Sequence, residues 1–218
     1  MGWNVDRVCL WMQANNKPYQ WCYPAEGDAF PEPESVSAVV SFGGAVSAND
    51  GNSLDWVRQE HVFIEQVLKH NLPFLGICLG GQILARILGS NVAAHPQEAN
   101  EVGFHRIFPT EHSGSFLTKP LTVMQWHSEG FEVPDGCVRI ARGDLFPNQG
   151  FRYGDNVFGL QFHPEVNPAA LAIWQQRNRQ KKPNQLSDDV RVQHMREAIA
   201  HDAAITEWVD QFLGQWSP

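Results

Sequence analysis

A short glycine-rich segment in the first half of the chain constrains the fold more than any other feature. Residues 74–77 form an apolar run short enough to predict a strand, and residues 80–88 have the pattern of a helix. Between them lies Cys78, flanked by three glycines that allow a sharp strand-to-helix turn. We expect its thiol at the carboxyl end of a sheet and beside a helix N-terminus, which favours the thiolate. The alternative is a buried free cysteine without function, which is common in proteins.

The order of the other elements predicts the fold class. An apolar run at residues 37–42 ends at two glycines, and a helix pattern follows at residues 54–70. Strand, helix, strand and helix in this order indicate a parallel sheet with right-handed crossovers. Short strand patterns then follow one another, which predicts an antiparallel extension; they lie at residues 102–109, 121–126, 138–142, 150–153 and 157–162. We therefore expect an α/β fold, with an open, mostly parallel twisted sheet flanked by helices and a small antiparallel extension.

The length of the chain favours a single domain over residues 1–218. A chain of 218 residues is long enough to bury a core without disulfides or a structural metal. Residues 184–218 are expected to form a helical C-terminal region, with Ser187 as the cap of its last helix.

Composition excludes several classes of function. A formal net charge of −8 argues against a protein that binds duplex nucleic acid. The four cysteines form no C-x-x-C pair, so free thiols in the cytoplasm are expected. We find no signal peptide and no membrane-spanning stretch. The histidines show no metal-ligand spacing, and we expect neither a metal nor a cofactor.

A second segment, residues 159–165, supplies a candidate base. A strand pattern delivers His163, and Pro164 sets the direction of Glu165 relative to the imidazole. A histidine with a carboxylate behind it is the arrangement that activates a nucleophile. Alone, this segment would be read as a surface turn; with Cys78 upstream, the catalytic interpretation is favoured.

Two glycines at the end of the first strand complete the candidate site. Gly43 and Gly44 allow backbone N–H groups to face a ligand closely. Together with the N–H of Leu79, they could form an oxyanion hole. The alternative is an ordinary glycine turn.

Taken together, Gly-Ile-Cys-Leu-Gly-Gly-Gln at residues 76–82, Gln-Phe-His-Pro-Glu at residues 161–165, and Gly43-Gly44 resemble class I glutamine amidotransferases. The resemblance runs over about residues 38–166 and is strongest to free-standing domains similar to the glutaminase domain of GMP synthase. It implies a flavodoxin-like architecture of the class I type. Weaker matches occur at residues 101–104, 126–129 and 148–151.

The resemblance also implies roles for individual residues. Cys78 would attack the glutamine carboxamide, while His163 moves the proton and Glu165 holds the imidazole. Backbone N–H groups near Gly44 and at Leu79 would stabilise the oxyanion. The substrate would be held by Gln82 and by a pocket wall made of Trp126, His127 and Ser128.

The chain departs from the family pattern in three places. Relatives often have His-Gly-Asp where residues 127–129 read His-Ser-Glu, which puts substrate preference in doubt. The usual Gly-Gly-Pro-Met is Gly-Gly-Ala-Val at residues 43–46. A core strand expected before Val5 is missing, which would leave an open edge in the sheet. A shortened chain, a start codon assigned too late, or a variant whose gap another segment fills would each explain this.

Three functions follow as hypotheses. The first is glutamine hydrolysis with ammonia passed to an acceptor on a separate synthetase subunit, since we find no ATP-binding segment in this sequence. The second uses the same triad to cleave a γ-glutamyl peptide or conjugate. The third is a non-catalytic descendant that binds a ligand or partner. Comparing glutaminase and peptidase turnover separates the first two, and labelling of Cys78 by a glutamine-like electrophile separates both from the third.

Overall fold

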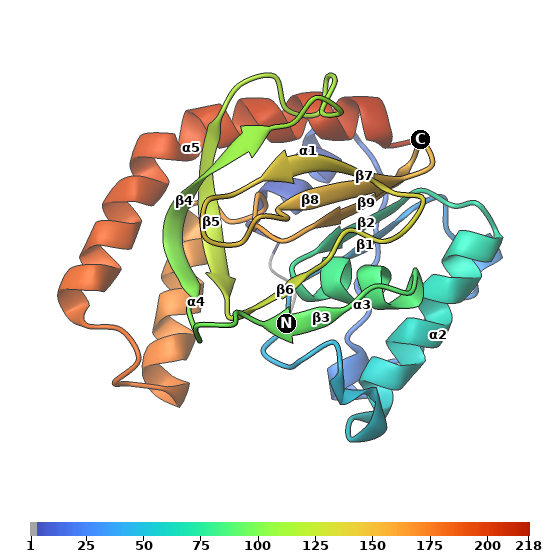
Figure 1. Ribbon diagram of the computed structural model, residues 1–218, viewed down its shortest axis with the longest axis horizontal. Coiled ribbons are helices and arrows are strands. Elements are labelled where there is room, and N and C mark those ends of the chain that lie inside the picture. The colour runs from blue at the N-terminus through green and yellow to red at the C-terminus, as the bar shows by residue number, and fades with distance from the viewer. Residues whose placement is uncertain (1–3) are drawn as a thin grey trace.

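Three adjacent strands of the central sheet run parallel and form its core. The computed structural model describes residues 4–218 and contains a seven-stranded sheet in the order β1-β2-β9-β8-β7-β4-β5 (Figure 1). The parallel strands are β1 (Val39–Ser41), β2 (Phe74–Ile77) and β9 (Val157–Leu160). The antiparallel strands that continue the sheet are β8 (Gly150–Tyr153), β7 (Val138–Arg142), β4 (Glu101–Pro109) and β5 (Leu121–His127). A separate antiparallel ribbon pairs β3 (Val92–Ala94) with β6 (Glu129–Phe131).

Helices cover both faces of the sheet because its central strands are buried on both sides. In β2, Leu75 and Ile77 face a core shared with α1 (Arg7–Ala14) and α5 (Asp188–Trp216). Phe74 faces the opposite core, shared with α2 (Asp55–Lys69) and α3 (Leu79–Ile87). This alternation follows from the two-residue period of a strand. Helix α4 (Pro168–Lys181) packs against α5, and 3₁₀ turns lie at Pro24–Glu26, Pro33–Ser35 and Asp50–Asn52.

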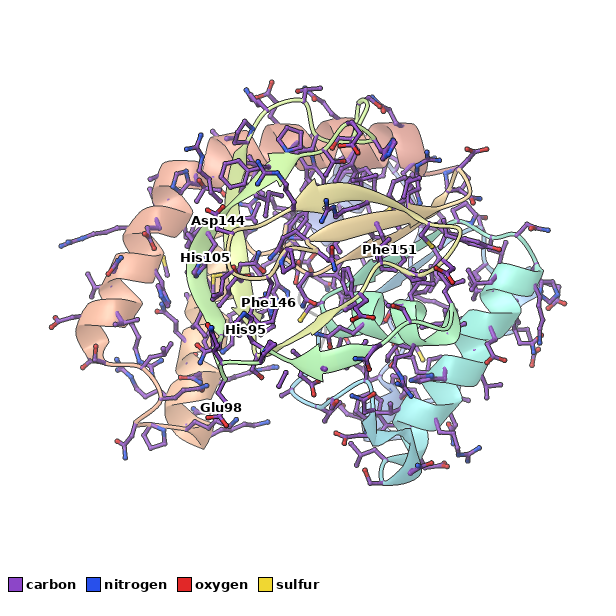
Figure 2. The ribbon with its side chains drawn as sticks, viewed as in Figure 1. His95, Glu98, His105, Asp144, Phe146 and Phe151 are labelled. Carbon is purple, nitrogen blue, oxygen red and sulfur yellow. The ribbon has the colours of Figure 1, made fainter. Side chains whose placement is uncertain are left out.

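The expected α/β class and the helix-flanked sheet are confirmed, but the antiparallel part is larger than the small extension expected. It contributes β8, β7, β4 and β5 to the seven-stranded sheet. Short connections are the physical reason, since a tight loop can join only antiparallel neighbours. One example is the turn from β8 to β9, where Gly154 has a φ of +58°. Phe151 of β8 is fully buried on the α3 side of this sheet (Figure 2).

Strand β1 lies at one edge of the sheet. Within residues 4–218 no strand pairs with its outer side. Instead, the ring of Trp21 packs against Phe42 at this edge, with 5.4 Å between the ring centroids. That the chain forms one domain stays a prediction, and residues 1–3 of that domain lie outside the described part. No helix among the described residues is both long and apolar enough to cross a membrane.

Candidate active site

Cys78 occupies the sharp turn between β2 and α3. Its backbone has φ 52° and ψ −105°, a region that non-glycine residues rarely adopt and that costs about 1–3 kcal/mol. The turn is held in place from the sheet, because the Cys78 N–H donates to the carbonyl of Leu160 at 2.7 Å. As the residue before α3, Cys78 lies next to helix N–H groups that have no acceptor within the helix.

Glycines allow this turn because the backbones approach too closely for a side chain. A Cβ added at Gly76 would lie 2.5 Å from the backbone of Gly80, and a Cβ at Gly80 would lie 2.4 Å from the carbonyl oxygen of Ser41. Both distances are below real van der Waals contacts, and the opposing atoms are backbone that cannot rotate away. The glycine spacing of the sequence therefore brings α3 against the ends of β1 and β2.

His163 and Glu165 lie together just beyond the end of β9. The His163 N–H donates to the carbonyl of Met124, which ties the segment to β5 at 2.8 Å. The Nδ1 atom of His163 is 2.7 Å from Oε1 of Glu165, and both side chains are buried. The structure thus brings the two residues into the base–carboxylate geometry expected from the sequence.

The imidazole also meets the cysteine. A Cβ added at Gly43 would lie 2.7 Å from Cε1 of His163 and 3.4 Å from Cβ of Cys78, so both side chains border the same glycine. Burial lowers the pKa of the His163 imidazole, but the Glu165 carboxylate and the Cys78 sulfur outweigh this effect and raise it well above its ordinary value. The geometry therefore suits a thiolate–imidazolium pair.

This contact predicts different effects for alanine at two neighbouring glycines. In Gly43→Ala the new methyl group would overlap the His163 ring, so we expect kcat to fall by about 100-fold or more. In the matched control, Gly44→Ala, the methyl group would meet Cδ2 of Leu79 at 2.6 Å, the far end of a side chain that can rotate. We expect a much smaller loss there. Turnover of purified variants measures both, and equal losses would contradict this account of Gly43.

The Arg7 side chain of α1 holds the turn that carries His163 and Glu165, and this residue was not singled out from the sequence. The buried Arg7 side chain donates to the backbone carbonyls of Pro164 and Val166, on both sides of Glu165. It also pairs with Asp202 of α5 at 2.5 Å. Arg7 thereby connects both helices to the His-Pro-Glu turn. A lone arginine in an N-terminal helix gives no sequence signal for this role, because its partners in the turn are backbone carbonyls.

Tryptophan rings flank the imidazole. Trp174 of α4 packs edge-on against His163, with 4.9 Å between the centroids. It also packs against Trp126 of β5, with 6.0 Å between the centroids. Trp126 was expected near the site, whereas Trp174 was not singled out from the sequence. The two residues lie far apart in the sequence, and only the packing of α4 brings Trp174 to the base.

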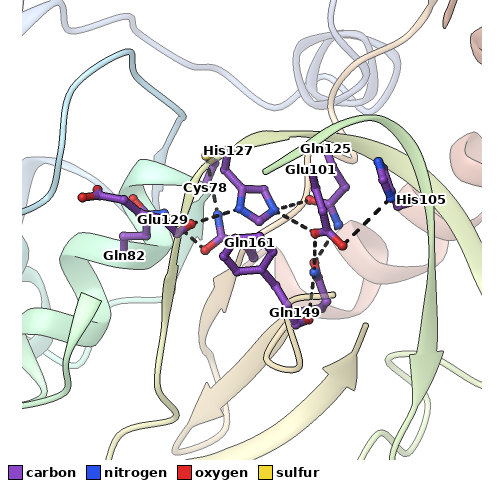
Figure 3. A network of polar contacts seen from close by, with 10 residues as sticks. Cys78, Gln82, Glu101, His105, Gln125, His127, Glu129, Gln149 and Gln161 are labelled. Carbon is purple, nitrogen blue, oxygen red and sulfur yellow. Dashed lines mark hydrogen bonds and ion pairs between the residues drawn. The ribbon is translucent and has the colours of Figure 1, made fainter. Parts of the chain in front are cut away.

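The other expected substrate-binding residues separate into two groups. Gly43, Gly44 and Ser128 are exposed to solvent, and Trp126 is half-buried. Leu79, Gln82 and His127 are buried. Gln82 and His127 belong to a polar network that also contains Glu101, Gln125, Gln149 and Gln161 (Figure 3). Contact of any of these residues with substrate stays a prediction.

Comparisons with known proteins found similar sequences. A family model described as glutamine amidotransferase class-I matches residues 3–172. A glutamine-hydrolysing GMP synthase component of Methanopyrus kandleri is 33% identical over 139 residues, covering 61% of this chain and 68% of that protein. Gamma-glutamyl peptidase 5 of Arabidopsis thaliana is 28% identical over 151 residues, covering 65% of this chain and 60% of that protein.

A solved structure is similar over almost the whole length. A glutamine amidotransferase from Thermotoga maritima superposes with a TM-score of 0.90 at 26% identity, covering 97% of this chain and 92% of that chain. This agreement confirms the architecture expected from the resemblance.

Proposed function

The chain belongs to the class I glutamine amidotransferase family, and we propose that it hydrolyses the side-chain amide of glutamine through a thioester on Cys78. The observation that carries the proposal is the convergence of three side chains from distant segments. Cys78 lies on a strained turn and borders Gly43, as does His163. Oε1 of Glu165 lies 2.7 Å from Nδ1 of the His163 imidazole. A nucleophile, a base and an orienting carboxylate in this arrangement are what acyl transfer requires.

In the first half of the proposed reaction, the Cys78 thiolate attacks the carboxamide carbon, and His163 holds the proton taken from the thiol. The C–N bond of the tetrahedral intermediate then breaks, and the imidazolium gives that proton to the departing ammonia. The γ-glutamyl group remains bound to sulfur as a thioester. Glu165 stabilises the imidazolium throughout this sequence.

In the second half, water attacks the thioester carbon and His163 accepts a proton from that water. The C–S bond breaks, glutamate leaves, and the sulfur recovers its proton. Backbone N–H groups near Gly44 and at Leu79 would stabilise the oxyanion in both halves. Leu79 suits this role as the first residue of α3, where N–H groups have no acceptor within the helix.

We place the ammonia acceptor on a separate synthetase subunit. The support for this placement is the relative from Methanopyrus kandleri, which is named as one subunit of a glutamine-hydrolysing GMP synthase.

The test is selective labelling of one cysteine by a glutamine-like diazo-ketone, combined with a glutaminase assay. Burial raises the pKa of the Cys9 and Cys22 thiols and raises that of Cys137 to about 11, so these three should react slowly near pH 7. We expect stoichiometric modification of Cys78 by mass spectrometry, with ammonia release from glutamine lost in parallel. A folded sample that is neither labelled nor active would instead support a non-catalytic binding role.

A second candidate is cleavage of γ-glutamyl peptides or conjugates by the same triad. Two observations favour it: the similarity to a γ-glutamyl peptidase of Arabidopsis thaliana, and the exposed Ser128 in a stretch where the sequence departs from the family. Parallel kcat/KM measurements with glutamine and with a γ-glutamyl dipeptide decide between the two. A higher value for the dipeptide would replace glutaminase with peptidase.

A further inference from the structure

The buried side-chain amide of Gln161 contacts the sulfur of Cys78. This residue follows β9 directly and is fully buried. Its Nε2 atom lies 3.8 Å from Sγ of Cys78 and donates to it (Figure 3). An amide has no ionisable proton to give up, so this donor is different in kind from the imidazole of His163.

The orientation of the Gln161 amide is determined by its neighbours. Oε1 of Gln161 accepts from Nε2 of Gln82 at 3.2 Å. The same Nε2 of Gln82 donates to the backbone carbonyl of Glu129 at 2.9 Å. Because a carbonyl can only accept, Gln82 must present its N–H groups there. Gln161 must therefore turn its oxygen toward Gln82 and its N–H toward the sulfur.

The Glu129 carbonyl also contacts the buried side chain of His127, which lies against Glu101. Nδ1 of His127 lies 3.0 Å from that carbonyl and therefore donates to it. On the other side of the ring, Nε2 lies 3.0 Å from the Glu101 carboxylate, which also accepts from Gln149 at 2.9 Å. The polar groups that orient Gln161 are thus continuous with a buried polar network in the core, as Figure 3 shows.

We propose that Gln161 is a further catalytic residue, whose N–H stabilises the Cys78 thiolate, and that Gln82 is the positioning residue that holds it in this orientation. The proposal deepens the proposed function, because it assigns a new role at the same sulfur. A donated hydrogen bond favours the charged form of the acceptor, most of all where water is excluded. The same N–H stabilises sulfur as the leaving group when the thioester is hydrolysed.

The experiment measures the reactivity of Cys78 without substrate. Iodoacetamide alkylation of the full chain is followed against pH by mass spectrometry of the Cys78 peptide, for the native protein and for Gln161→Met. Methionine has a similar length and adapts to its site but donates no hydrogen bond. We expect the midpoint of the profile to rise by about one pH unit and the rate below it to fall about tenfold. His163 and Glu165, the ionisable groups facing the sulfur, are unchanged in the variant.

The matched control is Gln149→Met. Gln149 is equally buried and loses hydrogen bonds to Glu101 and to the Phe146 carbonyl, but its side chain does not bond to Gln161. We expect its alkylation midpoint to stay that of the native protein. Equal midpoints in all three proteins, or equal shifts in both variants, would overturn the proposal.

A second variant keeps the proposal testable if Gln161→Met fails to fold. Gln82→Met removes the hydrogen bond to the Gln161 oxygen, and we expect the alkylation midpoint to shift in the same direction by a smaller amount. An unchanged midpoint would count against the proposal. Alkylation needs no glutamine, so its outcome is separate from that of the glutaminase assay. If the Gln161→Met substitution shifts the alkylation midpoint but the native protein releases no ammonia, the proposed function is rejected and the role of Gln161 stands.

Discussion

We expect the replacement of Cys78 with alanine to abolish amide hydrolysis and to leave the fold intact. Alanine keeps the Cβ atom and the backbone geometry of the turn but removes the only atom proposed to bond to the substrate. We expect turnover to fall by about 10⁴-fold or more, as for the loss of other acyl-transfer nucleophiles. The sulfur is small, so the free energy of unfolding should change by only about 1 kcal/mol.

Ammonia release and urea unfolding of the same preparation check this result. Cys137→Ala is the matched control, because it removes a half-buried thiol whose pKa is raised by burial and which lies outside the proposed site. Its turnover should equal that of the native protein. Native turnover in Cys78→Ala would reject the proposed mechanism.

Replacing Glu165 with glutamine gives the second large effect. The amide keeps the shape of the side chain but removes the charge 2.7 Å from Nδ1 of His163. Burial then lowers the pKa of His163 with only the Cys78 sulfur left to oppose it. We expect kcat to fall by about 10³-fold to 10⁴-fold, as when the carboxylate of a comparable triad is neutralised.

The pH dependence of this variant has a definite sign. In the native protein the raised pKa of His163 keeps the imidazole protonated above its ordinary range. In the proposed mechanism this proton goes to the leaving ammonia. In Glu165→Gln that proton is lost at lower pH, and the alkaline limb of the kcat profile should move to lower pH. A limb at the native position would contradict the role of Glu165.

Asp202→Asn is the control for disturbance of the turn. It removes a half-exposed carboxylate paired with Arg7 but leaves the charge beside His163 in place. We expect its kcat to stay within about tenfold of the native value, because Arg7 keeps its hydrogen bonds to the carbonyls of Pro164 and Val166. A loss as large as that of Glu165→Gln would show that the turn, rather than the charge, is being disturbed.

The candidate triad could be predicted because each member lies in a local pattern with its own physical signature. Glycines around Cys78 indicate a turn that other residues could not form, and proline after His163 ends the strand that carries it. The extent of the antiparallel sheet was underestimated, since the number of short strands that join one sheet depends on pairing between distant segments. Arg7 and Trp174 were missed for the same reason: their contacts at the site come from α1 and α4.

The strand-to-helix turn, the residue at its apex and the histidine–carboxylate pair could be predicted from local sequence, because backbone geometry and side-chain chemistry are local properties. The buried groups that surround these residues become visible only in the folded chain. Gln82 and His127 were expected to hold substrate, and the fold places them among buried amides that lead to the sulfur through Gln161. A hydrogen-bond network depends on the directions of many donors at once, and these directions are set when distant segments pack together.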